Sequence, residues 1–425
     1  MMKVLRRIIG VLVLAALPTA AFTQIDISGI GTWSPMYNSL ADWEGGAFGA
    51  YENGDFDVGW GIYNILTHVI TGDSLYVIKL QDGTYRELWI VDLDANVPRY
   101  TFRYAMLDGS DPHEVTLSTG DYSSKQFVMY SLANNAVVDQ QPDKSDWDLL
   151  LTKFWHTGLS YTVTGFLAND GVGVSVFHAA DSASAADATL ADATEFTDSI
   201  AAIGNSWYQL EGMSIIPVDT MAYFVKTTAG DTFKLQVTYF ESGMSGLGKV
   251  GIRTQLLSGT PDPGFSYDTL VMGSGYANEV FYKLGTMDAV EVPRNTWDIG
   301  FRTGFFTSSI ITNTTMGVEL YTYPYGDTAA WVGPTSVINT AERDAGIRVY
   351  PVPAGNEVFI HHDLDTPGDF GIRLYDVSGR LVREFPVSPA GRSDIRLDLS
   401  GIRPGVYLLR MEGTGIRAVS KISVK

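Results

Sequence analysis

Alternating apolar and polar residues dominate the chain and predict β-strands rather than helices. Residues 76–91 and 223–239 each contain two such runs around a tight turn, at Asp82-Gly83 in the first segment and at Gly230-Asp231 in the second. Asp-Gly between alternating runs favours a hairpin, because the turn needs residues that tolerate positive φ. The pattern therefore predicts β-hairpins as the main building blocks of an all-β fold.

The two hairpin segments belong to a longer internal repeat. Tyr76 and Tyr223 are 147 residues apart, and so are Trp60 and Trp207. Three further pairs of segments resemble each other in the same order, namely 127–132 and 280–284, 146–149 and 296–299, and 171–177 and 317–321. Self-similarity at this period predicts two diverged copies of one β-rich unit of about 150 residues within residues 24–323.

The C-terminal block alternates most cleanly of all. Residues 346–425 predict about seven short strands, which would form a small immunoglobulin-like β-sandwich. Residues 324–345 combine prolines and glycines and predict a linker before this block. Residues 179–203 are rich in alanine but also in Asp and Ser, so we expect one short helix or an ordered surface loop there.

Residues 1–23 have the pattern of a secretory signal peptide. Basic residues within the first seven positions precede an apolar run over residues 8–17, and small residues follow it. Such a run is too short for a membrane helix, which needs about 20 apolar residues. We expect cleavage before Gln24, or alternatively after Ala21, and no transmembrane segment in the exported chain.

Charge separates the body from the C-terminal block. The whole chain carries −19, but residues 24–340 hold 14 basic and 37 acidic residues, a net charge of −23. Residues 341–425 hold 12 basic and 11 acidic residues, and most of the basic ones are arginine. A body this acidic is poorly suited to nucleic acid, since phosphate contacts need clustered Lys and Arg. The contrast indicates two regions of different origin that meet near residue 341.

The residue types that are missing exclude several kinds of chemistry. The chain has no cysteine, which excludes disulfides, thiolate metal sites, a thiol nucleophile and a lipid-anchored cysteine. It has no Gly-rich phosphate loop, no Gly-x-Ser-x-Gly elbow and no His-Glu-x-x-His motif. Residues 92–96 begin like a calcium loop but lack its glycine and closing glutamate. We therefore predict no enzyme, no catalytic residue and no protein-bound metal ion.

Two Trp-Asp pairs occupy corresponding places in the repeat. We interpret Trp147-Asp148 and Trp297-Asp298 as structural, with the ring packed in a core and the carboxylate accepting backbone N–H groups. The segment Trp-Asp-Ile-Gly-Phe-Arg at 297–302 and the hairpin at 223–235 resemble the HmuY-like haem-binding proteins of Bacteroidetes. The resemblance covers about residues 50–323 and implies an exported all-β body that binds haem to acquire iron.

Haem would require axial ligands such as histidine or methionine. The body has four histidines, all in the first copy, so the two copies cannot both use a bis-histidine site. The candidate ligands are His156, His178, Met213, Met221 and, less favoured, His68. His113 follows Asp-Pro and indicates a surface turn. Each candidate also has an ordinary role, since buried histidines mostly form hydrogen bonds and methionines mostly fill cores. A body at −23 would also repel an anionic porphyrin without local compensation.

The C-terminal block closely resembles the type A sorting domain of the type IX secretion system. The resemblance rests on Tyr350-Pro-Val-Pro353, Leu374-Tyr-Asp-Val-Ser-Gly-Arg380, Leu399-Ser-Gly401, Pro404-Gly-Val-Tyr407 and the terminal residues 421–425. It implies contact with the type IX machinery and removal of residues 346–425 by a sortase-like peptidase. The released body would be secreted or attached to surface polysaccharide.

These patterns together predict an exported surface or secreted protein. Haem or porphyrin binding, with haem or haemoproteins as partners, is the function implied by the HmuY-like resemblance. The alternative is a cofactor-free adhesin, glycan-binding protein or structural β-protein of the cell surface, since nine tryptophans and 22 tyrosines can supply stacking surfaces.

Overall fold

Strands make up nearly all of the regular structure, which confirms the predicted all-β class. The computed structural model describes residues 25–54, 56–212, 214–304, 307–323, 348–350, 354–361, 370–376, 380–385, 395–413 and 416–425. The predicted signal peptide (1–23) and linker (324–345) lie outside these residues. The chain divides into a body and a C-terminal unit that covers Thr335–Lys425.

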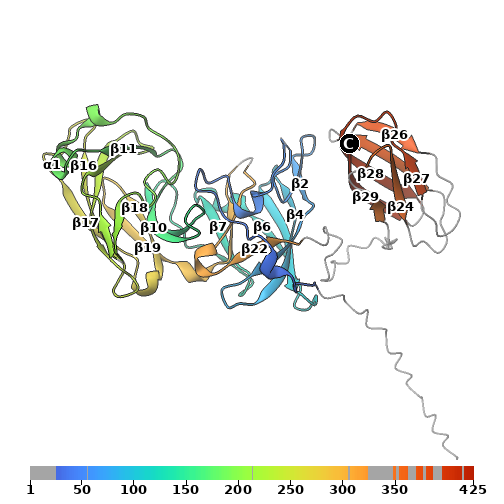
Figure 1. Cartoon of the computed structure of the whole chain (residues 1–425), viewed down its shortest axis with the longest axis horizontal. Helices are drawn as coiled ribbons and strands as arrows, with labels where there is room; N and C mark the ends of the chain where they lie inside the picture. The colour runs from blue at the N-terminus through green and yellow to red at the C-terminus, as the bar shows by residue number, and fades with distance from the viewer. Residues whose placement is uncertain are drawn as a thin grey trace, which may run out of the picture. The chain divides into compact units, whose positions relative to one another are not determined.

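Twenty-two strands of the body follow each other as two series of eleven (Figure 1). The first series is β1 (Gly61–Asn64), β2 (Val69–Gly72), β3 (Leu75–Lys79), β4 (Tyr85–Asp94), β5 (Arg99–Met106), β6 (His113–Ser118), β7 (Phe127–Ser131), β8 (Ala136–Val138), β9 (Leu149–His156), β10 (Tyr161–Ala168) and β11 (Gly173–His178). The second series is β12 (Tyr208–Glu211), β13 (Ser214–Pro217), β14 (Met221–Lys226), β15 (Thr232–Glu241), β16 (Lys249–Leu256), β17 (Ser266–Val271), β18 (Asn278–Lys283), β19 (Asp288–Pro293), β20 (Ile299–Arg302), β21 (Ile310–Thr312) and β22 (Glu319–Thr322).

Helices are short and lie between strands. The α-helix of the described residues, α1 (Ser182–Asp187), falls in the alanine-rich segment and begins after Asp181, whose side chain accepts a hydrogen bond from the Ser184 N–H. The 3-10 turns are η1 (Ile30–Thr32), η2 (Ala47–Gly49), η3 (Thr119–Tyr122), η4 (Leu190–Asp192), η5 (Ser274–Tyr276), η6 (Arg294–Thr296) and η7 (Thr314–Met316).

The two series exchange their last three strands. In the first module, β4 pairs with β3 and β2 along one edge and with β5 along the other, and β22, β1 and β6 pair with β3, β2 and β5; the second sheet is β21-β20-β7-β8. The second module contains the sheet β11-β14-β15-β16-β17 and the sheet β10-β9-β18-β19. Strands β9–β11 therefore complete the module of the second series, and β20–β22 complete the module of the first. Figure 1 shows the orange chain of β22 returning to the blue and cyan strands.

The Trp-Asp pairs mark the two points of exchange and have the same role at both. The Asp148 N–H donates to the Tyr282 carbonyl and its carboxylate accepts from the Leu284 N–H, while Asp298 makes the matching bonds to Tyr130 and Leu132. Asn169 and Asn313 each bridge the turn by donating to the carbonyl of the preceding tryptophan. Both carboxylates are buried and accept backbone N–H groups, which confirms their structural interpretation.

Alternation along each strand sorts its side chains between two sides of the sheet. In β3, Tyr76 and Ile78 pack in the main core of the first module, while Leu75 and Val77 pack against Ile25 on the other side. Full burial of one such side chain contributes about 1.5–3 kcal/mol. The predicted turns also occur, because Gly83 and Gly230 have positive φ between β3 and β4 and between β14 and β15.

The C-terminal unit is a separate β-sandwich. Its strands are β23 (Arg348–Tyr350), β24 (Glu357–His361), β25 (Phe370–Asp376), β26 (Leu381–Phe385), β27 (Ile395–Asp398), β28 (Gly405–Gly413) and β29 (Ile416–Val424). They form the sheets β23-β24-β27 and β26-β25-β28-β29. One apolar cluster that includes Ile360, Leu374 and Leu409 contains residues of both sheets. This two-sheet arrangement agrees with the predicted sandwich.

Candidate functional site

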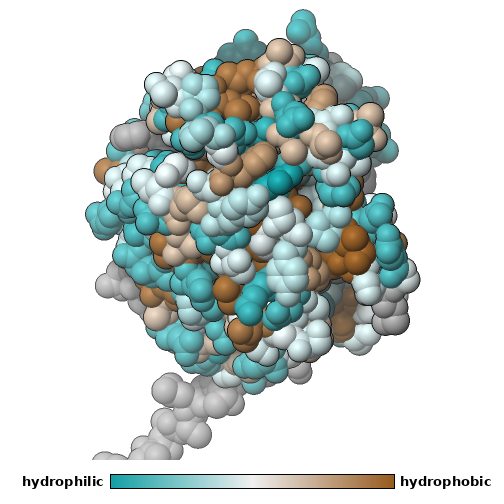
Figure 2. Space-filling view, turned by 90° about the vertical axis from the view of Figure 1, so that its left-hand side faces the viewer, coloured by the Kyte–Doolittle hydropathy of each residue, from teal (hydrophilic) through white to brown (hydrophobic). Residues whose placement is uncertain are grey.

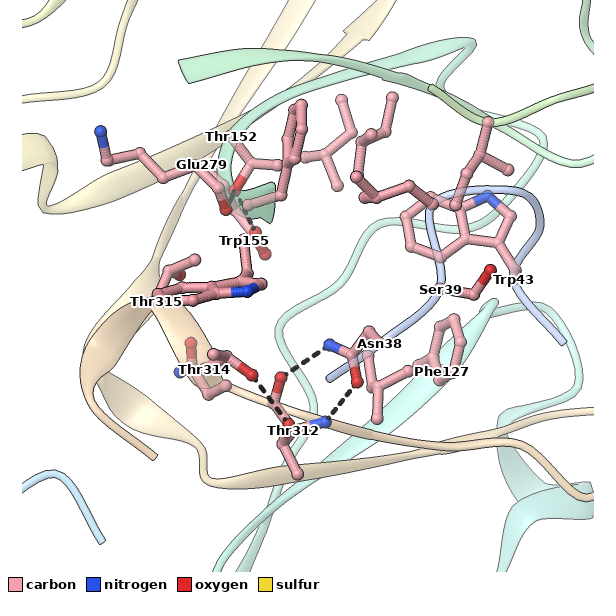
Figure 3. A pocket seen from close by; sticks show the side chains of 18 of the residues that line it. Asn38, Ser39, Trp43, Phe127, Thr152, Trp155, Glu279, Thr312, Thr314 and Thr315 are labelled. Carbon is pink, nitrogen blue, oxygen red and sulfur yellow. Dashed lines mark hydrogen bonds between the residues drawn. The ribbon is translucent and has the colours of Figure 1, made fainter. Parts of the chain in front are cut away.

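The outer faces of two equivalent sheets border a cavity within the body. Phe127 and Met129 of β7 belong to an apolar cluster on the sheet β21-β20-β7-β8, and Leu150 and Phe154 of β9 belong to a cluster on the sheet β10-β9-β18-β19. Trp43 packs against both clusters. Between them lies a cavity of about 100 Å³ that we call the inter-module cavity (Figure 3). It is lined by residues from both modules.

The segment before β1 forms one wall of this cavity and links the modules. The Asn38 side chain donates to the Thr312 carbonyl at 2.8 Å and accepts from the Thr312 N–H at 3.0 Å, which fixes the segment to β21. The Trp43 indole N–H donates to the Ala168 carbonyl at the end of β10. The Arg302 guanidinium adds ion pairs of 2.6 Å to Glu44 and to Asp170. These contacts hold the aromatic ring of Trp43 at the cavity.

Aromatic rings form much of the lining. Figure 3 shows Trp43 and Phe127 on one side and Trp155 on the opposite side. Trp155 is stacked on Tyr37 with ring centroids 4.5 Å apart and planes 6° from parallel. Trp297 also lines the cavity, and its buried indole Nε1 has no hydrogen-bond partner among the described residues. A buried N–H without an acceptor is destabilising by about 1–3 kcal/mol.

Glu279 places a carboxyl group in this aromatic setting. It lies on β18 and is 8% exposed, and its Oε2 accepts a 3.3 Å hydrogen bond from the Thr152 hydroxyl. Burial raises the pKa of Glu279 to about 7, although Arg294 and Thr152 act in the opposite direction. Figure 3 shows Glu279 and Thr152 together on one side of the space between the rings. A group with this pKa changes charge near neutral pH.

Two cations near Glu279 are directed to other partners. Arg294 on η6 donates from Nη1 to the Tyr276 carbonyl at 2.8 Å and from Nη2 to the Thr315 hydroxyl. The Lys153 ammonium lies 4.6 Å from the centroid of the Tyr276 ring and 3.5 Å from the Thr164 hydroxyl. Burial, together with the charge of Arg294, lowers the pKa of Lys153 to about 8. Neither cation forms an ion pair with Glu279.

The predicted haem ligands do not converge. His156 ends β9, where its Nδ1 accepts the Leu159 N–H, whereas His178 ends β11 in the other sheet of the second module. His178 is paired in register with Met221, but hydrogen-bonded strands lie about 4.8 Å apart, which leaves no space for a porphyrin between the two side chains. The Met221 sulfur accepts a contact from the Tyr223 hydroxyl inside the core.

The remaining candidates do not complete a haem site. His68 belongs to the first module, has positive φ, and its Nδ1 lies 2.6 Å from the Tyr63 hydroxyl. Met213 lies outside the described residues. Among the residues that the structure describes, no cluster of three or more His, Cys, Asp or Glu could hold a metal ion. The inter-module cavity contains none of the predicted ligands and is smaller than the roughly 150 Å³ cavity that accepts benzene, so it does not fit haem.

Sequence reasoning missed the residues that do meet at the cavity. Trp43 precedes the first strand by many residues, and Glu279 stands beside Asn278 at the polar start of β18, where a solvent-facing residue is expected. The repeat carries one signal: Glu279 stands where the other copy has Phe127, because Glu279 directly precedes Val280 and Phe127 directly precedes the matching Val128. An acidic residue at a repeat position that otherwise holds a phenylalanine indicates a role other than packing.

Comparison with known families identifies the C-terminal block. Residues 348–425 match the family described as "Secretion system C-terminal sorting domain". No curated protein matches the chain, and the HmuY-like resemblance of the body is not supported by a family match. No helix among the described residues is long and apolar enough to cross a membrane. The C-terminal unit is thus a type IX sorting domain, and the protein is secreted by that machinery to the cell surface or beyond.

Proposed function

We propose that this exported protein is a binding protein that holds the end group of an organic ligand in the inter-module cavity. The observation that carries the proposal is a cavity between two equivalent sheets, lined by aromatic rings and by the buried carboxyl group of Glu279, whose one hydrogen bond comes from Thr152. Ligand sites typically combine apolar walls with a few polar groups. This is the cofactor-free alternative, and it involves binding without turnover.

The size of the cavity limits what it can hold. A space of about 100 Å³ is about two thirds of the cavity that accepts benzene, so only a group of a few heavy atoms can be enclosed. The rest of a larger ligand would lie outside, where the stacked rings of Tyr37 and Trp155 offer a flat apolar surface. A surface glycan, peptide or small metabolite could each present such an end group.

The exposed face of the second module offers no large apolar patch as an alternative binding site. In Figure 2, apolar residues on that face lie in small groups between polar ones. Isolated apolar groups are normal for a protein surface and do not indicate an interface. After delivery, we expect the sortase-like peptidase to remove the sorting domain and leave the body to act alone or attached to surface polysaccharide.

Ligand-observed NMR with a set of small probes tests the proposal. The set would contain propylamine, propionate, propionamide and isopropanol, each added to the full chain. We expect saturation transfer to at least one probe and its loss in Thr314→Trp, which would fill the cavity from η7. Thr269→Trp on β17, an exposed position outside the cavity lining, is the matched control. Equal signals for both variants, or no signal for any probe, would contradict the proposal.

A further inference from the structure

We propose that the end group held in the inter-module cavity is an organic cation, an alkylammonium group that faces the carboxylate of Glu279. This inference rests on the proposed function and adds the chemical class of the ligand. It follows from three features of the cavity: a buried carboxylate that forms no ion pair, rings that surround it, and its place in a strongly acidic body.

Arg294 attracts the carboxylate of Glu279 and opposes the rise in pKa that burial causes, but it forms no direct ion pair with it. The one protein contact of this carboxylate within the cavity is the Thr152 hydroxyl, and none of the ion pairs among the described residues includes it. Buried carboxylates are usually paired, because an isolated charge is costly to remove from water. The other copy of the repeat folds with Phe127 at the same strand position, so the fold itself does not require an acid here.

The charged groups that face Glu279 leave it as the acceptor for a ligand. Arg294 on η6 and Lys153 on β9 direct their charges to the Tyr276 carbonyl, the Tyr276 ring and threonine hydroxyls. Asp42, the other acid in the lining, uses Oδ1 to accept the N–H groups of Glu44 and Gly45. Of the two acids that line the cavity, Glu279 has one hydrogen bond and Asp42 has two.

The rings around the carboxylate are suited to a cation. Trp43, Phe127 and Trp155 surround the space beside Glu279 in Figure 3, and Trp297 completes the lining. The negative face of an aromatic ring attracts a cation by about 0.5–2 kcal/mol, and cages of such rings recognise alkylated ammonium groups. A cavity of about 100 Å³ can enclose a small ammonium head group but not a sugar ring.

The net negative charge of the body also favours a cationic ligand. Residues 24–340 carry a net charge of −23, so the long-range field attracts cations and repels anions. A carboxyl group whose pKa is about 7 also makes the site sensitive to pH, because a cation binds the ionised form. The affinity for a cation should therefore increase as the pH rises through neutrality. Loss of charge from Lys153, whose pKa is about 8, acts in the same direction.

A pair of probes with the same shape tests the inference. Choline and 3,3-dimethylbutan-1-ol differ in one atom that carries the charge, and both would be titrated calorimetrically into the full chain at about pH 8. We expect choline to bind at least about tenfold more tightly, which corresponds to about 1.4 kcal/mol. Glu279→Gln should abolish that preference and the rise in choline affinity near pH 7, and leave only the contribution of Lys153 near pH 8, while the alcohol binds the variant as it binds the wild type.

The outcomes separate this inference from the proposed function. Equal affinities of choline and the alcohol for the wild type, or a choline preference that survives Glu279→Gln, would overturn the cation while leaving the binding cavity in place. Stronger binding of propionate than of choline would overturn it in the same way. Failure of both isosteres and of every NMR probe would overturn both proposals.

Discussion

The two modules of the body share the order of their main strands, although β1 and β2 extend one sheet while β12 and β13 pair separately, and they differ in how their corresponding polar positions are satisfied. Asp148 accepts the Leu284 N–H and an ion pair from Lys283 at 3.0 Å, whereas Asp298 accepts only neutral donors, from Leu132, Ala133 and the side chains of Ser131 and Gln81. Glu279 in the second module replaces Phe127 in the first. The copies thus share their main architecture, while these two positions differ in charge at an exchange point and at the cavity.

The largest expected effect concerns the exchanged strands. The second module is continuous in the chain, but the first needs β20–β22, which supply Ile299, Phe301 and Leu320 to its core. We expect residues 143–296 to fold when expressed alone and residues 25–142 to remain unfolded. Circular dichroism would show whether each fragment has β-structure, and thermal melting would show whether it unfolds cooperatively.

A shortened body provides the matched control for this prediction. The Thr296 hydroxyl donates to the Gln140 side chain at 2.7 Å, so the two ends of the second module lie close together. Residues 25–142 joined through a short Gly-Ser linker to 297–323 should therefore fold cooperatively. If residues 25–142 alone unfold as cooperatively as the joined chain, the exchange is not needed for the first module.

The second prediction compares the two carboxylates at the exchange points. Asp148→Ala and Asp298→Ala should each lower the free energy of unfolding by about 2–3 kcal/mol, because buried N–H groups lose their acceptors. Burial raises the pKa of Asp298, so its charge is poorly stabilised, and Asp298→Asn should be better tolerated. Asp148→Asn also loses the pair with Lys283 and should be about 1–2 kcal/mol worse than Asp298→Asn. Denaturant unfolding measures the free energy of unfolding of each variant. Equal losses in Asp148→Asn and Asp298→Asn would contradict a stabilising contribution from the ion pair.

The third prediction concerns the pH dependence of stability that comes from Glu279, the acid that corresponds to Phe127 in the comparison of the two sheets. Because the pKa of Glu279 is about 7 in the folded protein and lower when unfolded, the folded state binds the proton more tightly. Its contribution to stability therefore declines as the pH rises from about 4.5 to about 7. Relative to wild type, Glu279→Gln should gain on the order of 2 kcal/mol at about pH 8 and little at about pH 4.5. Phe127→Tyr is a control that should show no such pH-dependent gain.

The smallest expected effect is a difference between two buried tryptophans at matching repeat positions. The Trp60 N–H donates to the Ser308 carbonyl at 2.9 Å, whereas the Trp207 N–H has no partner among the described residues. Both rings are almost fully buried, so replacement by phenylalanine leaves similar cavities. Trp60→Phe should therefore be about 1 kcal/mol more destabilising than Trp207→Phe, because it also leaves a buried carbonyl unpaired. Equal melting temperatures would contradict this reading of the hydrogen bond.

Local features of the fold could be predicted because local residues determine them. Alternation and the turns at Gly83 and Gly230 indicate hairpins, and the role of the Trp-Asp pairs follows from their residue types. The exchange of strands could not be predicted, because a repeat at a period of about 150 residues does not say whether β20 pairs with β7 or with β18. Both strands are apolar, and their pairing depends on contacts between distant residues.

The cavity was less predictable than the fold. Its lining comes from separate segments, among them the one around Trp43, strand β9 and strand β18, which become neighbours only after both modules assemble. His156 and His178 are candidate haem ligands by residue type, because imidazole binds metals. The structure places them at the ends of strands in different sheets. Residue type alone does not identify the residues of a binding site, because the role of a side chain depends on its position between the sheets.

The route of the chain through the body has a mechanical consequence for a protein at the cell surface. Ile25 and Tyr323, near the two ends of the body, belong to one apolar cluster on the sheet of the first module, and the Tyr323 N–H donates to the Leu75 carbonyl. Tension applied between these ends would be borne by the pairing of β22 with β3, because both entry and exit lie on that sheet. The second module lies outside this line of force, so shear on an anchored molecule would reach it only after the first module yields.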